Sequence, residues 1–184
     1  MAKTEIRMTG SGGQGVIMGT IILAEAAFDD GKQVVQCQAY GPEARGGSSK
    51  AETIISDEHI AYTKVILPDL LLSLTQVSLD KYIGCLKQNA IVVVDEEITV
   101  PESVERDHKV YKLPILRGAT EVIKNHMSAN IISVGVVNQI MDVCTQGSLE
   151  AAVLNHVPKG TEESNLNALH YGQELVKNYK NKIK

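Results

Sequence analysis

A glycine-rich segment places the strongest constraint on how this chain can fold. It reads Gly10-Ser-Gly-Gly-Gln-Gly15, and it lies between a short strand pattern at residues 4–8 and an apolar stretch at residues 16–28 that holds a single charge. Glycine adopts backbone angles that other residues avoid, so the segment predicts a tight loop between a strand and a buried helix. Gly31 predicts the end of that helix, and residues 33–40 predict a second strand. This order of elements indicates an α/β domain with parallel neighbouring strands.

The middle of the chain departs from an all-parallel pattern. Residues 48–56 alternate as a strand does, and they follow the second strand with no helix between, which indicates an antiparallel or mixed region. Pro68 predicts the start of a helix, and a strand over residues 65–72 followed by a helix is the alternative. Short apolar runs predict further strands at residues 90–94 and 110–113.

The last third of the chain predicts three helices. They cover residues 130–143 with an interruption at Gly135, residues 148–155, and the stretch from Thr161 onward. The sequence contains no repeat, low-complexity segment or linker. We therefore expect one domain over residues 1–184, with an α/β fold in which helices cover a mixed, largely parallel sheet.

Composition excludes several classes of function. The chain has 184 residues, of which 18 are basic and 22 acidic, and its formal net charge is −4. This balance argues against a protein that neutralises a nucleic-acid backbone, and an aromatic content of 4% without Trp argues against a base-stacking surface. No apolar run reaches the roughly 20 residues that cross a membrane, and the first residues lack a signal-peptide core. We expect a cytoplasmic protein with neither nucleic acid nor membrane as a partner.

Residues that commonly bind metals or catalyse reactions form no recognisable set. The three cysteines, Cys37, Cys85 and Cys144, stand far apart, and the five histidines lack partners at helical spacing. This pattern predicts neither a metal site nor a disulfide framework. The acidic run Asp95-Glu96-Glu97 follows a strand, where a solvated loop is a more common role than acid–base catalysis. The sequence predicts no catalytic residue in this chain.

The first glycine loop is a candidate anion-binding site. Its Gly10-x-Gly12-x-x-Gly15 spacing directs backbone amides and a helix N-terminus at one place, which favours a negatively charged group. The acidic residue of a nicotinamide site is missing from the end of the second strand, and so are the lysine and hydroxyl of a nucleoside triphosphate loop. A tight turn that only lets the helix pack on the sheet is the alternative. The candidate residues are Gly10, Ser11, Gly12, Gly13, Gln14 and Gly15.

A second glycine-rich loop follows the second strand and reads Tyr40-Gly-Pro-Glu-Ala-Arg-Gly-Gly47. An arginine held between glycines suits a phosphate or carboxylate, which it can grip with two parallel hydrogen bonds. A pair between Glu43 and Arg45, or a contact with another protein, is the alternative. The candidate residues of this ligand or subunit-interface loop are Gly41, Glu43, Arg45, Gly46 and Gly47.

These two loops, together with the later Asn130-Ile-Ile-Ser-Val-Gly135, resemble the gamma subunit of the 2-oxoacid:ferredoxin oxidoreductases, most closely the 2-oxoglutarate type. The resemblance covers nearly the entire chain. It implies the fold of the gamma domain of pyruvate:ferredoxin oxidoreductase. It also implies an accessory subunit that is inactive alone.

In that family, thiamine diphosphate, magnesium and iron–sulfur clusters are expected on partner subunits, named alpha, beta and a ferredoxin-like delta. The resemblance implies that electrons pass to ferredoxin or another acceptor, and that coenzyme A is the co-substrate. With 2-oxoglutarate as substrate the product is succinyl-CoA. No cofactor is expected to bind firmly to this chain, and its glycine loops are expected to face coenzyme A or a partner subunit. An independent dinucleotide-binding module or redox sensor is the alternative function.

Overall fold

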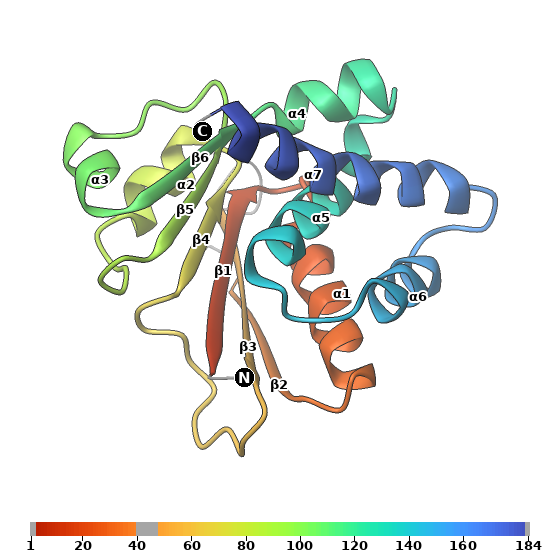
Figure 1. The fold of residues 1–184 in the computed structure, drawn as a ribbon, viewed down its shortest axis with the longest axis horizontal. Coiled ribbons are helices and arrows are strands. Elements are labelled where there is room, and N and C mark those ends of the chain that lie inside the picture. Colours follow the sequence, from red (N-terminus) through yellow and green to blue (C-terminus); the bar gives the residue numbers. More distant parts are fainter. Residues whose placement is uncertain (1–2, 40–47, 183–184) are drawn as a thin grey trace.

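The computed structural model describes residues 3–39 and 48–182. They form a six-stranded sheet with the first strand of the chain in its interior (Figure 1). This strand, β1 (Thr4–Ser11), is buried along nearly its whole length. Its neighbours are β3 (Ser48–Ser56), which is antiparallel to it, and β4 (Leu70–Ser73), which is parallel. The sheet order is β2-β3-β1-β4-β5-β6. The edge strands are β2 (Gln33–Ala39) and β6 (Lys109–Leu113), and β5 (Ile91–Asp95) lies between β4 and β6.

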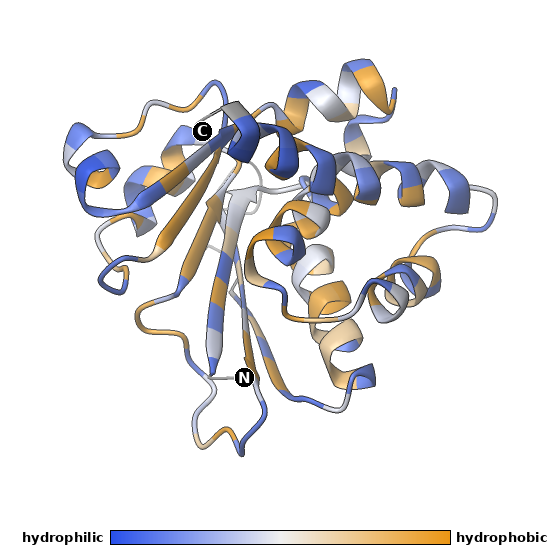
Figure 2. Cartoon of the chain, in the orientation of Figure 1, coloured by the Kyte–Doolittle hydropathy of each residue, from blue (hydrophilic) through white to orange (hydrophobic). Residues whose placement is uncertain are grey.

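Helices cover both faces of the sheet, which confirms the expected α/β class with a mixed, largely parallel sheet. One face carries the larger core, against α1 (Val16–Asp29), α5 (Ala129–Met141), α6 (Gln146–His156) and α7 (Glu162–Lys182). The other face carries a smaller core, against α2 (Gln76–Tyr82) and α3 (Glu102–Asp107). Figure 2 shows apolar residues gathered on β4 and β5 and on the helices that pack against the sheet, whereas β1 mixes polar and apolar residues.

The first two strands are parallel in direction but are not neighbours, contrary to the sequence-based expectation. Strand β3 lies between them and pairs with both in antiparallel fashion, with Thr4 opposite Ile55 and Val34 opposite the same residue. A hairpin return therefore fills the position that a second parallel strand occupies in a dinucleotide-binding fold. This difference removes the strand end on which such a fold carries its acidic ribose contact.

The helix predicted to start at Pro68 is wrong, and the alternative of a strand followed by a helix is confirmed. Residues 70–73 form β4, whose four residues are buried between the two helical layers. Leu70 and Leu72 belong to the larger core, and Leu71 belongs to the smaller one. Because both faces are covered, the strand is apolar throughout and lacks the alternation that separates a strand from a helix.

The predicted interruption of the fifth helix at Gly135 is also wrong. Helix α5 continues through this residue, and α7 crosses over it (Figure 1). A Cβ atom at Gly135 would overlap the carbonyl oxygen of Leu169, and one at Gly172 would overlap that of Ile132. The two glycines are a reciprocal pair that brings the backbones of α5 and α7 together.

The predicted end of the first helix at Gly31 is confirmed. Helix α1 ends just before this residue, whose φ is 81°.

The chain passes to opposite faces of the sheet after β1 and after β4. The connection after β1 leads to α1 in the larger core, and the connection after β4 leads to α2 in the smaller core. At such a change of side, α/β proteins commonly bind ligands beside the carboxyl ends of the two strands, and we call this end of the sheet, at Ser11 and Ser73, the crevice. Three short segments complete the fold after β6: α4 (Ile115–Arg117), the π-helical η1 (Gly118–Val122) and η2 (His126–Ser128). No helix within the described ranges has the length and apolar character that crossing a membrane requires.

Candidate functional site

The first glycine loop lies at the mouth of this crevice and is closed by its own glutamine. Strand β1 ends at Ser11, whose amide donates to Gln14 Oε1 over 2.7 Å. The amide of Gln14 donates back to the Ser11 carbonyl over 3.2 Å. Gly10 leaves room for this arrangement, because a Cβ atom there would lie 2.5 Å from the same glutamine oxygen. The loop is therefore shaped before any ligand binds.

The outer side of the loop is open with respect to the described residues. A Cβ atom at Gly12 or Gly13 would meet none of their atoms within 4 Å. Gly13 and Gly15 have φ angles of 94° and 69°, which glycine adopts without steric cost. Helix α1 begins directly behind them at Val16, and no side chain of the described residues caps its first turn. The amides of a first turn without a side-chain cap are suited to an anion or to acceptor groups of a partner.

The loop is backed by a second helix start, which the sequence did not place next to it. A Cβ atom at Gly15 would lie 2.7 Å from Asn130 Nδ2, in the first turn of α5. The Asn130 Oδ1 atom accepts from the amide of Ile131 over 2.8 Å. The fold thus brings together two of the three motifs that carried the resemblance, the segments at residues 10–15 and 130–135.

The second glycine loop and its candidates Gly41, Glu43, Arg45, Gly46 and Gly47 lie outside the described residues. The strands that flank it are described. Ala39 at the end of β2 lies opposite Lys50, and Ser48 at the start of β3 lies opposite Ser11. Both flanks therefore end at the edge of the sheet that carries the first glycine loop.

A buried charge network lies under the α2 side of the crevice, and sequence reasoning missed it. Arg7 Nε donates to Glu52 Oε1 over 2.7 Å, and both side chains are about 95% buried. The same guanidinium donates to the carbonyl of Val65 over 2.8 Å. Lys50 completes the network with a bond of 2.9 Å to Glu52. The polar alternation of residues 48, 50 and 52 was the available signal, since it puts three polar side chains on one face of a strand.

The acidic run after β5 is engaged in holding the fold. The buried carboxylate of Asp95 accepts from the amide of Leu116 over 2.8 Å and from that of Glu97 over 3.3 Å. Glu96 pairs with the Arg117 guanidinium at 2.9 Å. These contacts join the end of β5 to the segment after β6. The side chains of Asp95 and Glu96 thereby take part in holding the fold.

The three cysteines are free thiols, and burial raises the pKa of Cys144 to about 12. Such a thiol is protonated at neutral pH and is unreactive. Among the described residues, no group of three metal-binding side chains gathers at one place.

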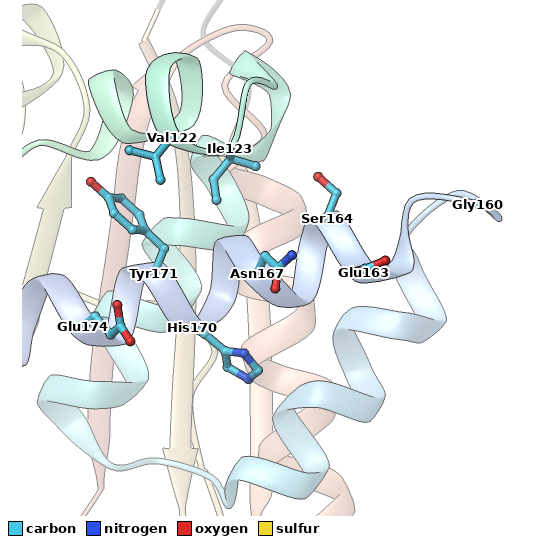
Figure 3. A pocket seen from close by; sticks show the side chains of 9 residues that line it. All are labelled: Val122, Ile123, Gly160, Glu163, Ser164, Asn167, His170, Tyr171 and Glu174. Atoms are coloured by element: carbon cyan, nitrogen blue, oxygen red, sulfur yellow. The ribbon is translucent and has the colours of Figure 1, made fainter.

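A surface hollow lies away from the glycine loop. It has a volume of about 740 Å³ and separates η1 from α7. Figure 3 shows Tyr171 and Val122 facing each other across it, whereas His170 points away. The His170 ring instead contacts Glu150 at 2.8 Å. Burial raises the pKa of Tyr171, and the ring of this residue covers Gly118 closely. The hollow is an open surface groove without a nucleophile–base pair.

Comparisons with known proteins agree with this architecture. The family profile of pyruvate ferredoxin/flavodoxin oxidoreductase matches residues 5–175. The 2-oxoglutarate synthase subunit KorC of Methanocaldococcus jannaschii is 46% identical over 177 residues, which are 95% of each chain. The gamma subunit of a keto/oxoacid ferredoxin oxidoreductase from Geobacter sulfurreducens has a TM-score of 0.87 at 36% identity, covering 97% of this chain and 99% of that one. A 2-oxoglutarate:ferredoxin oxidoreductase from Magnetococcus marinus shares the fold at 19% identity, with a TM-score of 0.87 over 97% of this chain and 32% of that one.

Proposed function

The chain belongs to the pyruvate ferredoxin/flavodoxin oxidoreductase family, and we propose that it is the gamma subunit of a 2-oxoglutarate synthase. The observation that carries this proposal is the full-length likeness to the archaeal KorC subunit, with both chains covered almost end to end. The motif resemblance drawn from residues 10–15, 40–47 and 130–135 is thereby confirmed at the level of the family.

The reaction of such an enzyme is the oxidative decarboxylation of 2-oxoglutarate with coenzyme A. The bond between the carboxylate and the oxo carbon breaks and releases carbon dioxide. A thioester bond forms with the coenzyme A sulfur, and two electrons leave to ferredoxin or another acceptor. Thiamine diphosphate, magnesium and iron–sulfur clusters belong in this proposal to the alpha, beta and delta partners. The described part of this chain gathers no ligand set for such a group.

Within the assembly, the gamma chain contributes a surface for the anionic part of coenzyme A. We assign this surface to Gly10, Ser11, Gly12, Gly13, Gln14 and Gly15. The preformed loop, the open space outside Gly12 and Gly13 and its place at the crevice support the assignment. The second loop, with Gly41, Glu43, Arg45, Gly46 and Gly47, is assigned to the same ligand or to the adjoining subunit interface, because its flanking strands end beside Ser11.

The proposal treats residues 1–184 as one gamma domain working in the cytoplasm. Three free thiols, none of them in a disulfide, suit a reducing compartment. The chain alone supplies no redox centre in this scheme. We therefore expect the purified chain to be inactive and the assembled complex to be active.

Affinity purification of the tagged chain from its host tests this function. We expect larger subunits to co-elute in fixed proportion, with thiamine diphosphate and iron in the eluate. That eluate should reduce a dye with 2-oxoglutarate and coenzyme A, and it should do so far better than with pyruvate or a branched-chain 2-oxoacid. A chain that elutes alone with a bound nucleotide would instead support an independent nucleotide-binding module. Dye reduction by the partner-free chain would refute the accessory role.

A further inference from the structure

Three cations surround one aromatic ring on the α2 side of the crevice. The Tyr82 ring centroid lies 5.6 Å from Arg7 Cζ, 5.9 Å from Lys50 Nζ and 5.5 Å from Lys81 Nζ. Glu52 accepts from Arg7 and from Lys50. One carboxylate therefore serves two cations, and the group carries a net positive charge.

Lys81 is the cation that this carboxylate does not contact. Its ammonium donates over 3.0 Å to the hydroxyl of Ser48, which is a neutral group. An ammonium group that donates to a neutral hydroxyl and contacts an aromatic face can replace the hydroxyl with an anionic acceptor, which forms a stronger hydrogen bond. Lys81 is exposed, so a ligand can reach it without opening the core.

The strand register places this group beside the glycine loop. Ser48 pairs with Ser11, the last residue of β1, and Lys50 pairs with Thr9. Cross-strand partners have Cα atoms about 5 Å apart, so the lysine group and the loop adjoin at one edge of the sheet. The crevice consequently has backbone amides on its α1 side and ammonium groups on its α2 side.

We propose that Lys81, supported by Lys50, binds a second phosphate group beside the glycine loop, and that this group is the 3′-phosphate of coenzyme A. The inference rests on the proposed function and assigns a residue that distinguishes coenzyme A from its 3′-dephospho form. A phosphomonoester carries close to two negative charges at neutral pH, which point-charge ammonium groups neutralise well. The diphosphate of the same molecule carries one charge on each phosphate and suits the amides of the loop.

The test uses the assembled synthase and compares coenzyme A with 3′-dephospho-coenzyme A. In the K81Q variant we expect the KM for coenzyme A to rise about tenfold, which corresponds to the loss of one charge-assisted hydrogen bond. The kcat and the KM for the dephospho form should stay unchanged. K81R keeps the charge and should retain most of the preference for coenzyme A.

Lys109 offers a matched control. Its ammonium lies 5.1 Å from the Tyr111 ring centroid, so it makes the same kind of contact, but it starts β6 at the opposite edge of the sheet. K109Q should leave both KM values unchanged. Adenosine 3′,5′-bisphosphate should inhibit the wild-type enzyme in competition with coenzyme A, and K81Q should weaken that inhibition about tenfold.

The outcomes separate the inference from the function on which it rests. If the K81Q synthase turns over with an unchanged ratio of the two KM values, the phosphate site is wrong and the gamma-subunit function stands. If K81Q raises both KM values equally, Lys81 does not select the 3′-phosphate and the inference also fails. If the wild-type assembly shows no turnover that depends on coenzyme A, the proposed function falls and takes the inference with it.

Discussion

Gly15 and Asn130 are in direct contact between the first turns of two helices that are far apart in the sequence. A Cβ atom at Gly15 would lie 2.7 Å from Asn130 Nδ2 and 3.0 Å from Asn130 Cβ. The start of α1 is thus fitted against the start of α5, and the glycine loop is held between them. This contact explains why the loop has a defined shape while its outer side stays open.

Replacing Gly15 with alanine should lower the free energy of unfolding by about 1–3 kcal/mol. The residue has a φ of 69°, and the added methyl group would displace Asn130. Urea unfolding followed by circular dichroism measures the change. Gly12→Ala is the matched control, because a Cβ atom there meets no atom of the described residues within 4 Å. Its unfolding free energy should stay within about 0.5 kcal/mol of wild type. Equal losses in the two variants would contradict the contact.

Gly172→Ala should be more damaging, with a loss of more than about 3 kcal/mol. The new methyl group would overlap the carbonyl oxygen of Ile132. Because this is a backbone atom of a buried helix, the overlap can be relieved only by moving the two helices apart. Gly147 provides the contrast, since it lies in the first turns of α6 with open space around it. Gly147→Ala should be neutral or stabilise by up to about 1 kcal/mol through helix propensity. Thermal unfolding of both variants decides whether the glycine pair sets the helix spacing.

Arg7→Met should cost about 3–5 kcal/mol, because it leaves the Glu52 carboxylate buried with Lys50, whose side chain is 23% exposed, as its remaining charged partner. The double variant R7M/E52M removes both charges and should regain most of that loss. Arg117→Met breaks an ion pair at the surface, at 2.9 Å from Glu96, and should cost less than about 1 kcal/mol. Urea unfolding of all three is the measurement. A double variant as unstable as Arg7→Met would show that Arg7 acts through its other contacts.

Asp30 should make the stability of the protein depend on acid pH. Burial raises the pKa of this carboxyl, but bonds from the Ser148 hydroxyl and the Thr145 amide and hydroxyl outweigh it, and the pKa is lowered. A lowered folded-state pKa stabilises the fold above the unfolded value of about 3.9, and the contribution is lost as pH falls through the folded value. Asp30→Asn should be less stable than wild type at pH 6–7, and the difference between the two curves should shrink as the pH falls below about 4. Parallel curves from pH 7 to pH 3 would rule out this linkage.

The elements that sequence reasoning placed well are those whose local pattern and tertiary environment agree. Residues 16–28 are apolar on nearly all sides and form a buried helix, and the short link between β2 and β3 produces an antiparallel pair as expected. Leu70 to Leu74 carry an apolar run that suits a strand and a helix equally, so burial on both faces decided between them. Gly135 was wrongly predicted to interrupt its helix. A glycine is needed there because α7, which comes later in the chain, packs closely against this position.

The candidate site was predictable only in its first part. The glycine spacing located the loop at the end of β1, since that signal is local. The contribution of Lys81 depends on where α2 docks, and the contribution of Lys50 depends on the register of β3 against β1. The contact of Asn130 with the glycine loop depends on the packing of α5 against α1. Side chains that meet through long-range pairing leave no signature in the spacing of one segment.

The position of β1 between β3 and β4 also governs the order of assembly. This strand precedes both of its partners in the chain, so Ile6 must wait for Thr53 on one side and Leu70 on the other before its backbone is paired. Such distant pairings slow folding relative to a helical bundle of the same length. A chain that lacks β4 would leave one side of β1 as an open strand edge, which is a template for pairing with other chains.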